Sequence, residues 1–351
     1  MKILGIDLGK YNSVACLFDT VSNEYLFFSF KSFPSEFKNL LAQSQAELVV
    51  MEACALAGWV NDLFQAEQIK TIVANTNDDA WSWKHVKHKT DKDDALKLTK
   101  LAALGLLAPV YIPLAESRQY RQLVKYRKRL VGRSTQIQNT IRALFNLQGI
   151  PILIGSRAWS IAGLEALGKY RKPLAECDAL SLWQGQLDIE LKALDRLWEE
   201  LDTVDTQLTA IAKKDNRVQL LESIPGVGRK TAEVIVAFID DAKRFKTARQ
   251  VSAYAGLVPR QDQSGETNRM GRITRRGPRL LRSTLVEAAW IMLQYNPWAL
   301  ALYERLCGGL KKRKKQAIIG VARKLLVLCW TLLRKQEKWD ADKAMILATK
   351  L

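Results

Sequence analysis

The sequence predicts an α/β domain with a mixed sheet at the N-terminal end, followed by an all-helical region. Two observations carry this expectation. Short apolar runs typical of strands are confined to the first 75 residues, and helical periodicity dominates from about residue 91 onward. The 351 residues leave room for two or three domains with sizeable cores. We place the boundaries at 1–115, 116–215 and 216–351.

Five runs rich in β-branched, aromatic and aliphatic residues are typical of strands. The first three lie close enough together for an antiparallel meander. Helix-length segments precede the last two, as in parallel βαβ units. We therefore expect a mixed sheet with helices on its faces. The runs are KILGID (2–7), SVACLFD (13–19), EYLFFSF (24–30), ELVVME (47–52) and KTIVAN (70–75).

Two stretches of the second region repeat apolar residues every seven positions, which is the spacing of a coiled coil. The two helices could pair with each other as a hairpin, or the second could pair with another copy of the chain. The pattern does not decide between them. The first series is Leu123, Leu130, Ile137 and Leu144, and the second is Leu187, Leu194, Leu201 and Leu208 with Leu197, Val204 and Ile211.

The segment LLESIPGVGRKTAEVIVAFI places two glycines between apolar helical runs. Gly226 and Gly228 allow a tight turn, and the helix that follows presents unpaired backbone N–H groups at its start. This is the helix–hairpin–helix pattern for holding a DNA phosphate without reading bases, and Lys230 suits it. A plain helical hairpin capped by glycine is the alternative.

The formal net charge is +18, from 54 Lys and Arg against 36 Asp and Glu. The excess is concentrated, because KKRKK occupies 311–315 and seven arginines lie between residues 260 and 282. A polyanionic partner explains such density, and a solvated basic face is the alternative. The seven candidate nucleic-acid contacts are Arg260, Arg269, Arg272, Arg275, Arg276, Arg279 and Arg282.

Cysteine usage and hydropathy favour a cytoplasmic protein with no membrane partner. Five scattered cysteines, an odd number, argue against a disulfide framework. No apolar run reaches membrane-spanning length: the longest, AIIGVARKLLVLCWTLL, is interrupted by Arg323 and Lys324. We therefore expect it to form a core helix.

Four acids in the first 94 residues suggest a site for a hard divalent cation. Asp7 and Glu52 each end an apolar strand-like run, and Asp91 and Asp94 share one face of a predicted helix. Carboxylate oxygens suit Mg²⁺ or Mn²⁺, and metal ions assist phosphoryl displacement. The alternative makes Asp91 a helix cap with Thr90 and leaves the acids of this turn to offset the helix dipole.

Ser264 is a second catalytic candidate, because it lies among arginines in the QSG step of AYAGLVPRQDQSGETNRMGRITRRGPRLLRS. Its hydroxyl could attack phosphorus if its proton were removed and cations stabilised the pentavalent centre. By composition alone, a serine before glycine is more often an ordinary turn residue.

The N-terminal segment GIDLGKYNSVACLFD also suggests the first phosphate loop of an actin-like ATPase. Such an ATPase needs a second phosphate loop, and the sequence contains none.

The whole chain resembles the transposases of the insertion-sequence-110 family, the DEDD recombinases. The matching motifs are GID, VME and KTDKDDA, followed by IPGVGRKTA, AGLVPRQDQSG and GRITRRGPRLLRSTLVEAA. They place the family's four acids on Asp7, Glu52, Asp91 and Asp94, and its essential serine on Ser264. The resemblance implies a RuvC-like domain of ribonuclease-H fold at residues 1–115.

What the resemblance implies about activity is specific. Such enzymes excise and insert their own mobile element in double-stranded DNA, and the serine forms a transient phosphoserine link to a DNA end. Metal-bound acids assist in a composite site built from two protomers, so a dimer or tetramer is implied. A structured guide RNA encoded by the element chooses the sites by base pairing, which suits a chain equipped for backbone contact.

Two other interpretations remain. A junction-resolving nuclease would use the same acids to hydrolyse DNA with water and would not need Ser264. A non-catalytic binding protein would keep only the basic surface, including the Arg-rich stretch around 118–142. If replacing Ser264 abolishes cleavage, the recombinase is favoured over the junction-resolving nuclease. A covalent DNA–protein adduct would exclude the non-catalytic binding protein.

Overall fold

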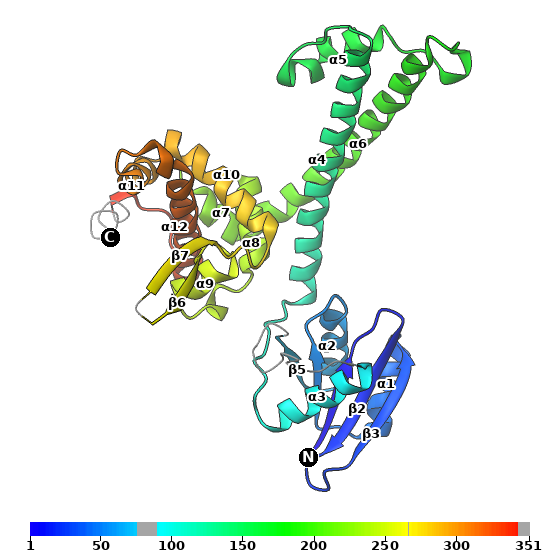
Figure 1. Cartoon of the computed structure of the whole chain (residues 1–351), viewed down its shortest axis with the longest axis vertical. Coiled ribbons are helices and arrows are strands. Elements are labelled where there is room, and N and C mark those ends of the chain that lie inside the picture. The colour runs from blue at the N-terminus through cyan, green and yellow to red at the C-terminus, as the bar shows by residue number, and fades with distance from the viewer. Residues whose placement is uncertain (76–89, 266, 343–351) are drawn as a thin grey trace. The chain divides into compact units, whose positions relative to one another are not determined.

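The computed structural model describes residues 1–75, 90–265 and 267–342, which form two compact units, Met1–Arg118 and Gln119–Leu351. Figure 1 shows strands concentrated in the first unit and helices in the second. Each unit has its own hydrophobic core. The division into three domains proposed from the sequence stays a prediction.

The first unit is built on a five-stranded mixed sheet of order β3-β2-β1-β4-β5. β1 pairs antiparallel with β2, and β2 with β3, whereas β1–β4 and β4–β5 are parallel. The predicted meander followed by βαβ units is therefore confirmed. The strands are β1 (Lys2–Asp7), β2 (Asn12–Asp19), β3 (Tyr25–Lys31), β4 (Leu48–Glu52) and β5 (Lys70–Ala74).

Helices cover both faces of this sheet, because its central strands are apolar on both sides. One face packs on α1 (Pro34–Ser44) and α2 (Ala57–Ala66), with Phe37 and Phe64 in the shared core. The other face packs on α3 (Asp91–Ala103), where Leu98 joins Ile3. The sheet is thus the middle layer of three (Figure 1).

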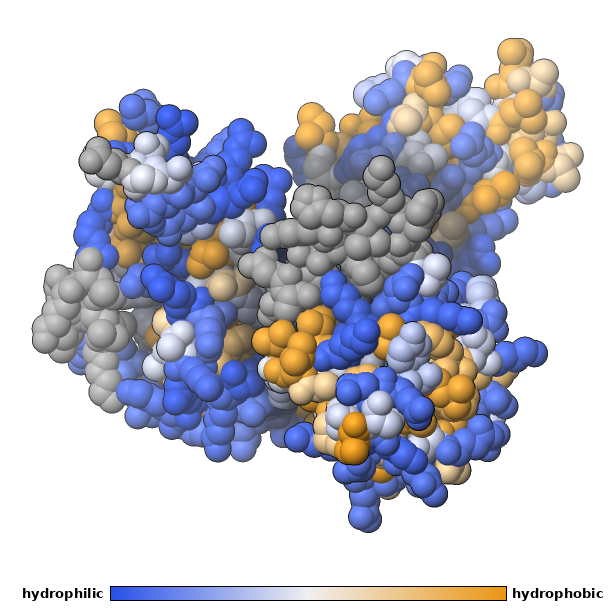
Figure 2. Space-filling view, turned by 60° about the horizontal axis from the view of Figure 1, so that its bottom comes forward, coloured by the Kyte–Doolittle hydropathy of each residue, from blue (hydrophilic) through white to orange (hydrophobic). Residues whose placement is uncertain are grey.

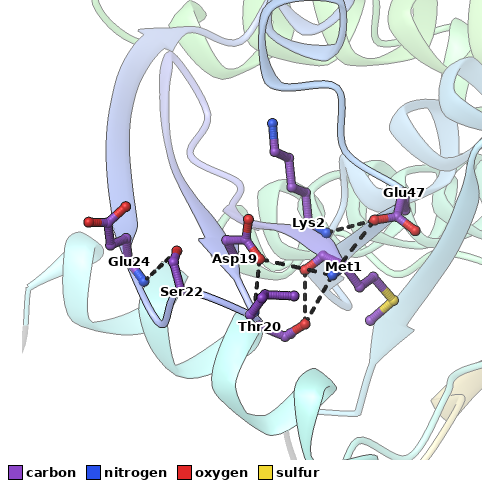
Figure 3. Close-up of polar contacts among 8 residues, drawn as sticks. Met1, Lys2, Asp19, Thr20, Ser22, Glu24 and Glu47 are labelled. Atoms are coloured by element: carbon purple, nitrogen blue, oxygen red, sulfur yellow. Dashed lines mark hydrogen bonds and ion pairs between the residues drawn. The ribbon is translucent and has the colours of Figure 1, made fainter.

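Polar contacts fix the start of β1 at the sheet end opposite to Asp7. The Met1 amino group donates to Thr20 Oγ1 at 3.1 Å, and the Lys2 backbone N–H donates to Glu47 Oε1 at 2.9 Å (Figure 3). Both partners precede or follow neighbouring strands. The contacts therefore help to set the register of β1, and with it the position at which Asp7 emerges.

At Gly5, β1 approaches α3 closely. A Cβ at this position would lie 2.5 Å from the carbonyl oxygen of Ala95 and 2.7 Å from Thr99 Cγ2. We expect Gly5→Ala to lower the free energy of unfolding by about 1–3 kcal/mol, because the helix must shift away from the strand. Urea unfolding measures the loss.

Gly132→Ala is the matched control for this prediction. Gly132 lies in a helix, and a Cβ there meets nothing within 4 Å. We expect this substitution to raise the free energy of unfolding by about 0.5–1 kcal/mol through helix propensity. An unchanged or stabilised Gly5→Ala variant would contradict the close packing of α3 on β1.

Two 33-residue helices of the second unit contact each other: α4 (Ala115–Leu147), whose first turn belongs to the first unit, and α6 (Leu182–Lys214). Ile141 and Leu144 of α4 share a cluster with Leu187 and Leu194 of α6. Trp198 Nε1 donates to Ser134 Oγ at 3.2 Å. The pair is therefore formed within one chain. Coiled-coil packing between the helices stays a prediction.

The rest of the second unit is a helical body around one large core. α12 passes through it, and ten of its 22 residues are buried. By length and composition, Lys311–Lys335 could cross a membrane, but 56% of its most apolar window is buried among the other helices. The described helices of the body are α7 (Asn216–Glu222), α8 (Arg229–Ile239), α9 (Ala248–Tyr254), α10 (Arg279–Tyr295), α11 (Pro297–Cys307) and α12 (Lys314–Lys335).

A β-hairpin interrupts this helical body, so the expectation of an all-helical second region was wrong at this point. β6 (Pro259–Ser264) pairs antiparallel with β7 (Thr267–Ile273). Almost every residue of the two strands is exposed. Because neither face is buried, the segment lacks the alternation of apolar and polar residues by which a strand is predicted.

On the face drawn in Figure 2, hydrophilic residues cover most of the protein surface.

Candidate active site and nucleic-acid interface

The sheet brings Asp7 and Glu52 to neighbouring positions. β1 and β4 are parallel with Ile6 opposite Met51, and the two acids are the next residues along each strand. Side chains alternate along a strand, so Asp7 shares the face of Gly5, and Glu52 shares the face of Val50. Both acids therefore occupy the face that α3 covers, at the carboxyl ends of adjacent strands.

α3 supplies the other two acids to this face. Its Ala95 touches Gly5, and Asp94 precedes Ala95 and is 7% exposed. Asp91 is the first residue of the helix and is exposed. The two lie three positions apart, so they are neighbours on the helix surface. The fold thus places three acidic positions close to one sheet edge, with Asp91 beside them.

The helix cap is formed by Asp93 and Thr90, not by Asp91. The Thr90 hydroxyl and backbone N–H donate to Asp93 Oδ2 at 2.6 and 3.0 Å, and the Asp93 N–H donates back to Thr90 Oγ1. These hydrogen bonds lower the pKa of Asp93. The reciprocal pattern is a capping box. The capping role therefore falls to Asp93, which leaves Asp91 and Asp94 outside the capping box.

The donor set suits a divalent cation, although the side chains do not form a closed cage. Within residues 1–75, 90–265 and 267–342, no three His, Cys, Asp or Glu side chains are grouped so that they could hold a metal ion. Mg²⁺ usually takes one or two protein carboxylates and completes its shell with water and substrate phosphates. The carboxylates of Asp7 and Glu52, with Asp94 beside them, match that requirement.

Ser264 lies at the exposed tip of the β6–β7 hairpin. It is the last residue of β6 and pairs with Thr267. Gly265 follows with φ of +55°, a left-handed conformation that glycine adopts readily. Asp262 and its cross-strand partner Arg269 occupy the same face as Ser264. The serine is therefore an exposed hydroxyl with a carboxylate and a guanidinium on its face of the ribbon.

The arginines after the hairpin have different roles. Arg275 and Gly277 have positive φ in a loop held to the end of α9, where Arg275 N–H donates to the Gly256 carbonyl. Arg282 donates to the carbonyl oxygens of Ala255 and Arg276, so it supports this loop. The exposed members of the set, which could meet a phosphate directly, are Arg260, Arg269, Arg272, Arg275, Arg276 and Arg279.

The predicted phosphate-binding turn joins α7 to α8. Gly226 has φ of +91°, and a Cβ there would lie 2.8 Å from Met292 Cγ, so glycine is required twice over. Gly228 caps α8 and has open space around it. Lys230 forms an ion pair with Asp205 at 2.9 Å while its side chain is 53% exposed. A helix–hairpin–helix function for this turn stays a prediction.

Several charged residues of α4 serve packing, which the sequence did not reveal. Arg121 Nε donates to the Ala237 carbonyl at 2.8 Å, and Arg127 pairs with Asp205 of α6. Asp205 also accepts from Lys230, and these partners lower its pKa against the effect of burial. Some arginines of this stretch therefore form hydrogen bonds and ion pairs within the protein. Nothing in their sequence spacing distinguishes them from exposed arginines.

Two family models match the chain. One, described simply as "Transposase" and named for the DEDD transposases of the IS110 type, matches residues 4–149, and the other, "Transposase IS116/IS110/IS902 family", matches residues 218–304. The first span contains the acidic sheet edge, and the second contains the α7–α8 turn and Ser264. Together the two matches cover more than half of the chain.

Curated relatives agree with the family models. The "Transposase for insertion sequence element IS1111A" of Coxiella burnetii is 28% identical over 97% of this chain and 91% of its own length. The "Probable family 20 transposase" of Pseudomonas aeruginosa is 29% identical over 82% and 84%. The "Pilin gene-inverting protein" of Moraxella bovis is 34% identical over 36% of this chain and 39% of its own length.

A mixed sheet with acids at its carboxyl edge, within a DEDD transposase match, defines a DNA transposase or recombinase with a RuvC-like domain. Such a domain implies a divalent metal and a DNA substrate. The chain belongs to the IS110/IS116/IS902 family of transposases.

Proposed function

We propose that this transposase excises and inserts a mobile element by a serine-based strand exchange assisted by its acidic sheet edge. The observation that carries the proposal is the placement of Asp7 and Glu52 on adjacent parallel strands, on the face covered by α3. The exposed hydroxyl of Ser264, on a ribbon in the second matched segment, supplies a nucleophile.

The chemistry assigned to Ser264 is a transesterification. Its Oγ–H bond breaks as Oγ bonds to phosphorus, and the phosphorus bond to the leaving sugar oxygen breaks, which produces a phosphoserine link and a free DNA hydroxyl. The serine proton passes to a base, and the departing oxygen takes one up. A hydroxyl on a second DNA strand then attacks the phosphoserine and restores Ser264.

The acids and arginines have separate roles in this proposal. Asp7, Glu52, Asp91 and Asp94 would hold Mg²⁺ or Mn²⁺, which supplies positive charge to phosphoryl oxygens when bound. Arg269, on the same ribbon face as Ser264, would stabilise the charge that develops on phosphorus. The acids position the cation and the arginine positions the phosphate, so loss of either should slow cleavage.

The partners follow from the same assignment. We infer a double-stranded DNA substrate, a structured guide RNA that selects the sites, and a homo-oligomer acting in the cytoplasm. Support comes from the net charge of +18 and from the exposed arginines around the hairpin. The Gly226–Gly228 turn and Lys230 would hold a DNA phosphate at the start of α8.

Excision of the element from a plasmid tests the proposal. Purified protein, Mg²⁺, and a transcript of the DNA that flanks the gene should together yield the rejoined plasmid junction, detected by sequencing. EDTA should abolish the product, and so should omission of the transcript. Cleavage of DNA junctions with neither rejoining nor transcript dependence would instead favour the junction-resolving nuclease.

A further inference from the structure

α12 carries two adjacent cations on its partly buried face. Arg323 and Lys324 lie halfway along it, between buried Ala322 and Leu325, and both are partly buried. Neither is ion-paired within the part of the chain that the structure describes. Partial burial of unpaired charge is costly, so a ligand of opposite charge would account for their presence.

The two cations line a groove of about 580 Å³ formed by α9, α12 and one face of the β6–β7 hairpin. α9 adds a third cation, Arg249, and the lining contains no acid. Burial and the adjacent Arg323 lower the pKa of Lys324, which an anion in the groove would reverse.

The hairpin supplies the groove with groups suited to a nucleobase. Gln261 and Met270 are cross-strand partners, so their side chains share one face of the ribbon. Met270 is 64% exposed, and a flexible thioether adapts to flat apolar surfaces. Gln261 Nε2 donates to Asn268 Oδ1 at 3.2 Å, so its Oε1 is the atom that can accept a hydrogen bond from a base. Ser264 pairs with Thr267 on the opposite face. The groove is therefore separate from the catalytic hydroxyl.

We propose that this groove binds a single-stranded nucleic-acid segment, with its phosphodiester backbone on Arg249, Arg323 and Lys324 and a base against Met270 and Gln261. A basic groove combined with adaptable contacts to base faces is the usual design for binding one strand. The proposal rests on the proposed function only in that a guided strand exchange exposes single strands of DNA and RNA.

Binding of short single-stranded oligonucleotides to the full-length protein in EDTA tests the proposal without strand cleavage. We expect the double variant Arg323→Gln/Lys324→Gln to lose roughly tenfold to a hundredfold in affinity, measured by fluorescence anisotropy. The slope of log affinity against log salt should shrink by about 1.4, because each phosphate contact to a single strand contributes roughly 0.7. DNA and RNA oligonucleotides form separate arms, which identify the strand that the groove prefers.

Lys213→Gln/Lys214→Gln is the matched control, since it removes the same charge from exposed positions at the end of α6. It should leave affinity and salt slope nearly unchanged. If both double variants lost affinity equally, the binding would be diffuse electrostatic attraction and the proposed groove site would be wrong. Competition by poly-glutamate as effective as that by oligonucleotides would assign the groove to an acidic protein partner. Thermal melting confirms that each variant is folded, and loss of binding with phosphoserine formation intact separates this proposal from the catalytic one.

Discussion

Ser264→Ala should abolish the covalent link between protein and DNA and slow strand exchange on the order of 10³-fold or more, the scale seen when a covalent nucleophile is removed. Ser264 is exposed at the tip of a ribbon, so loss of its hydroxyl leaves no buried cavity. The variant should therefore fold normally and still bind DNA. Denaturing gel electrophoresis with labelled DNA detects the adduct.

Thr267→Ala controls for disturbance of the hairpin, because Thr267 is the exposed cross-strand partner of Ser264. It should retain adduct formation. If Ser264→Ala cut DNA at the rate of the unmodified protein, water would be the nucleophile and the chain would act as a junction-resolving nuclease. A Ser264→Cys variant that forms an adduct at higher pH would support attack by this side chain, since thiolate is the reactive form of cysteine.

Asp7→Asn and Asp94→Asn should each reduce cleavage on the order of 10²-fold or more. Asparagine keeps the shape of the side chain but removes the charge that would hold a divalent cation worth several kcal/mol to the transition state. Calorimetric titration with Mn²⁺ should show weaker binding in both variants, and excess metal should partly restore cleavage. Metal binding should also weaken in acid, because protons compete for the carboxylates.

Asp93→Asn is the control that the structure provides for these variants. Asp93 lies beside Asp94 in sequence but accepts hydrogen bonds from Thr90 in the capping box. The substitution should lower stability slightly, through the weakened cap, and leave the metal dependence of cleavage unchanged. Comparable loss of cleavage in Asp93→Asn and Asp94→Asn would show that the helix end, and not an individual carboxylate, is what matters.

The sheet was predictable because each strand is a self-contained apolar run. The run 2–7 is β1 to the residue, and the other four runs fall within one residue of their strands. Their alternation also places Asp7 and Glu52 on one face. What the sequence could not supply is the contact of Gly5 with Ala95, because residues 90 positions apart meet only through the packing of α3.

The excess of basic residues could be predicted from the sequence, but which of them are exposed could not. Arg121, Arg127 and Arg282 all form hydrogen bonds or ion pairs inside the second unit, whereas the sequence placed them in two basic stretches available to nucleic acid. The hairpin was missed because RQDQS has no apolar periodicity. Conversely, the sequence indicated only that Arg323 and Lys324 interrupt an apolar run. Their place beside the hairpin depends on contacts between α9 and α12.

The ribbon that carries Ser264 has only two strands, and an isolated ribbon of that kind is marginally stable in water. Within the described residues, neither face of the ribbon is fully buried, so Ser264, the proposed nucleophile, has little of the rigid support that a core provides. We expect ordering of this serine to draw on the free energy of substrate binding. If Ser264 acts as proposed, we expect the protein to be chemically idle without its nucleic acids, and an encounter with the wrong DNA to end in dissociation before any strand is cut.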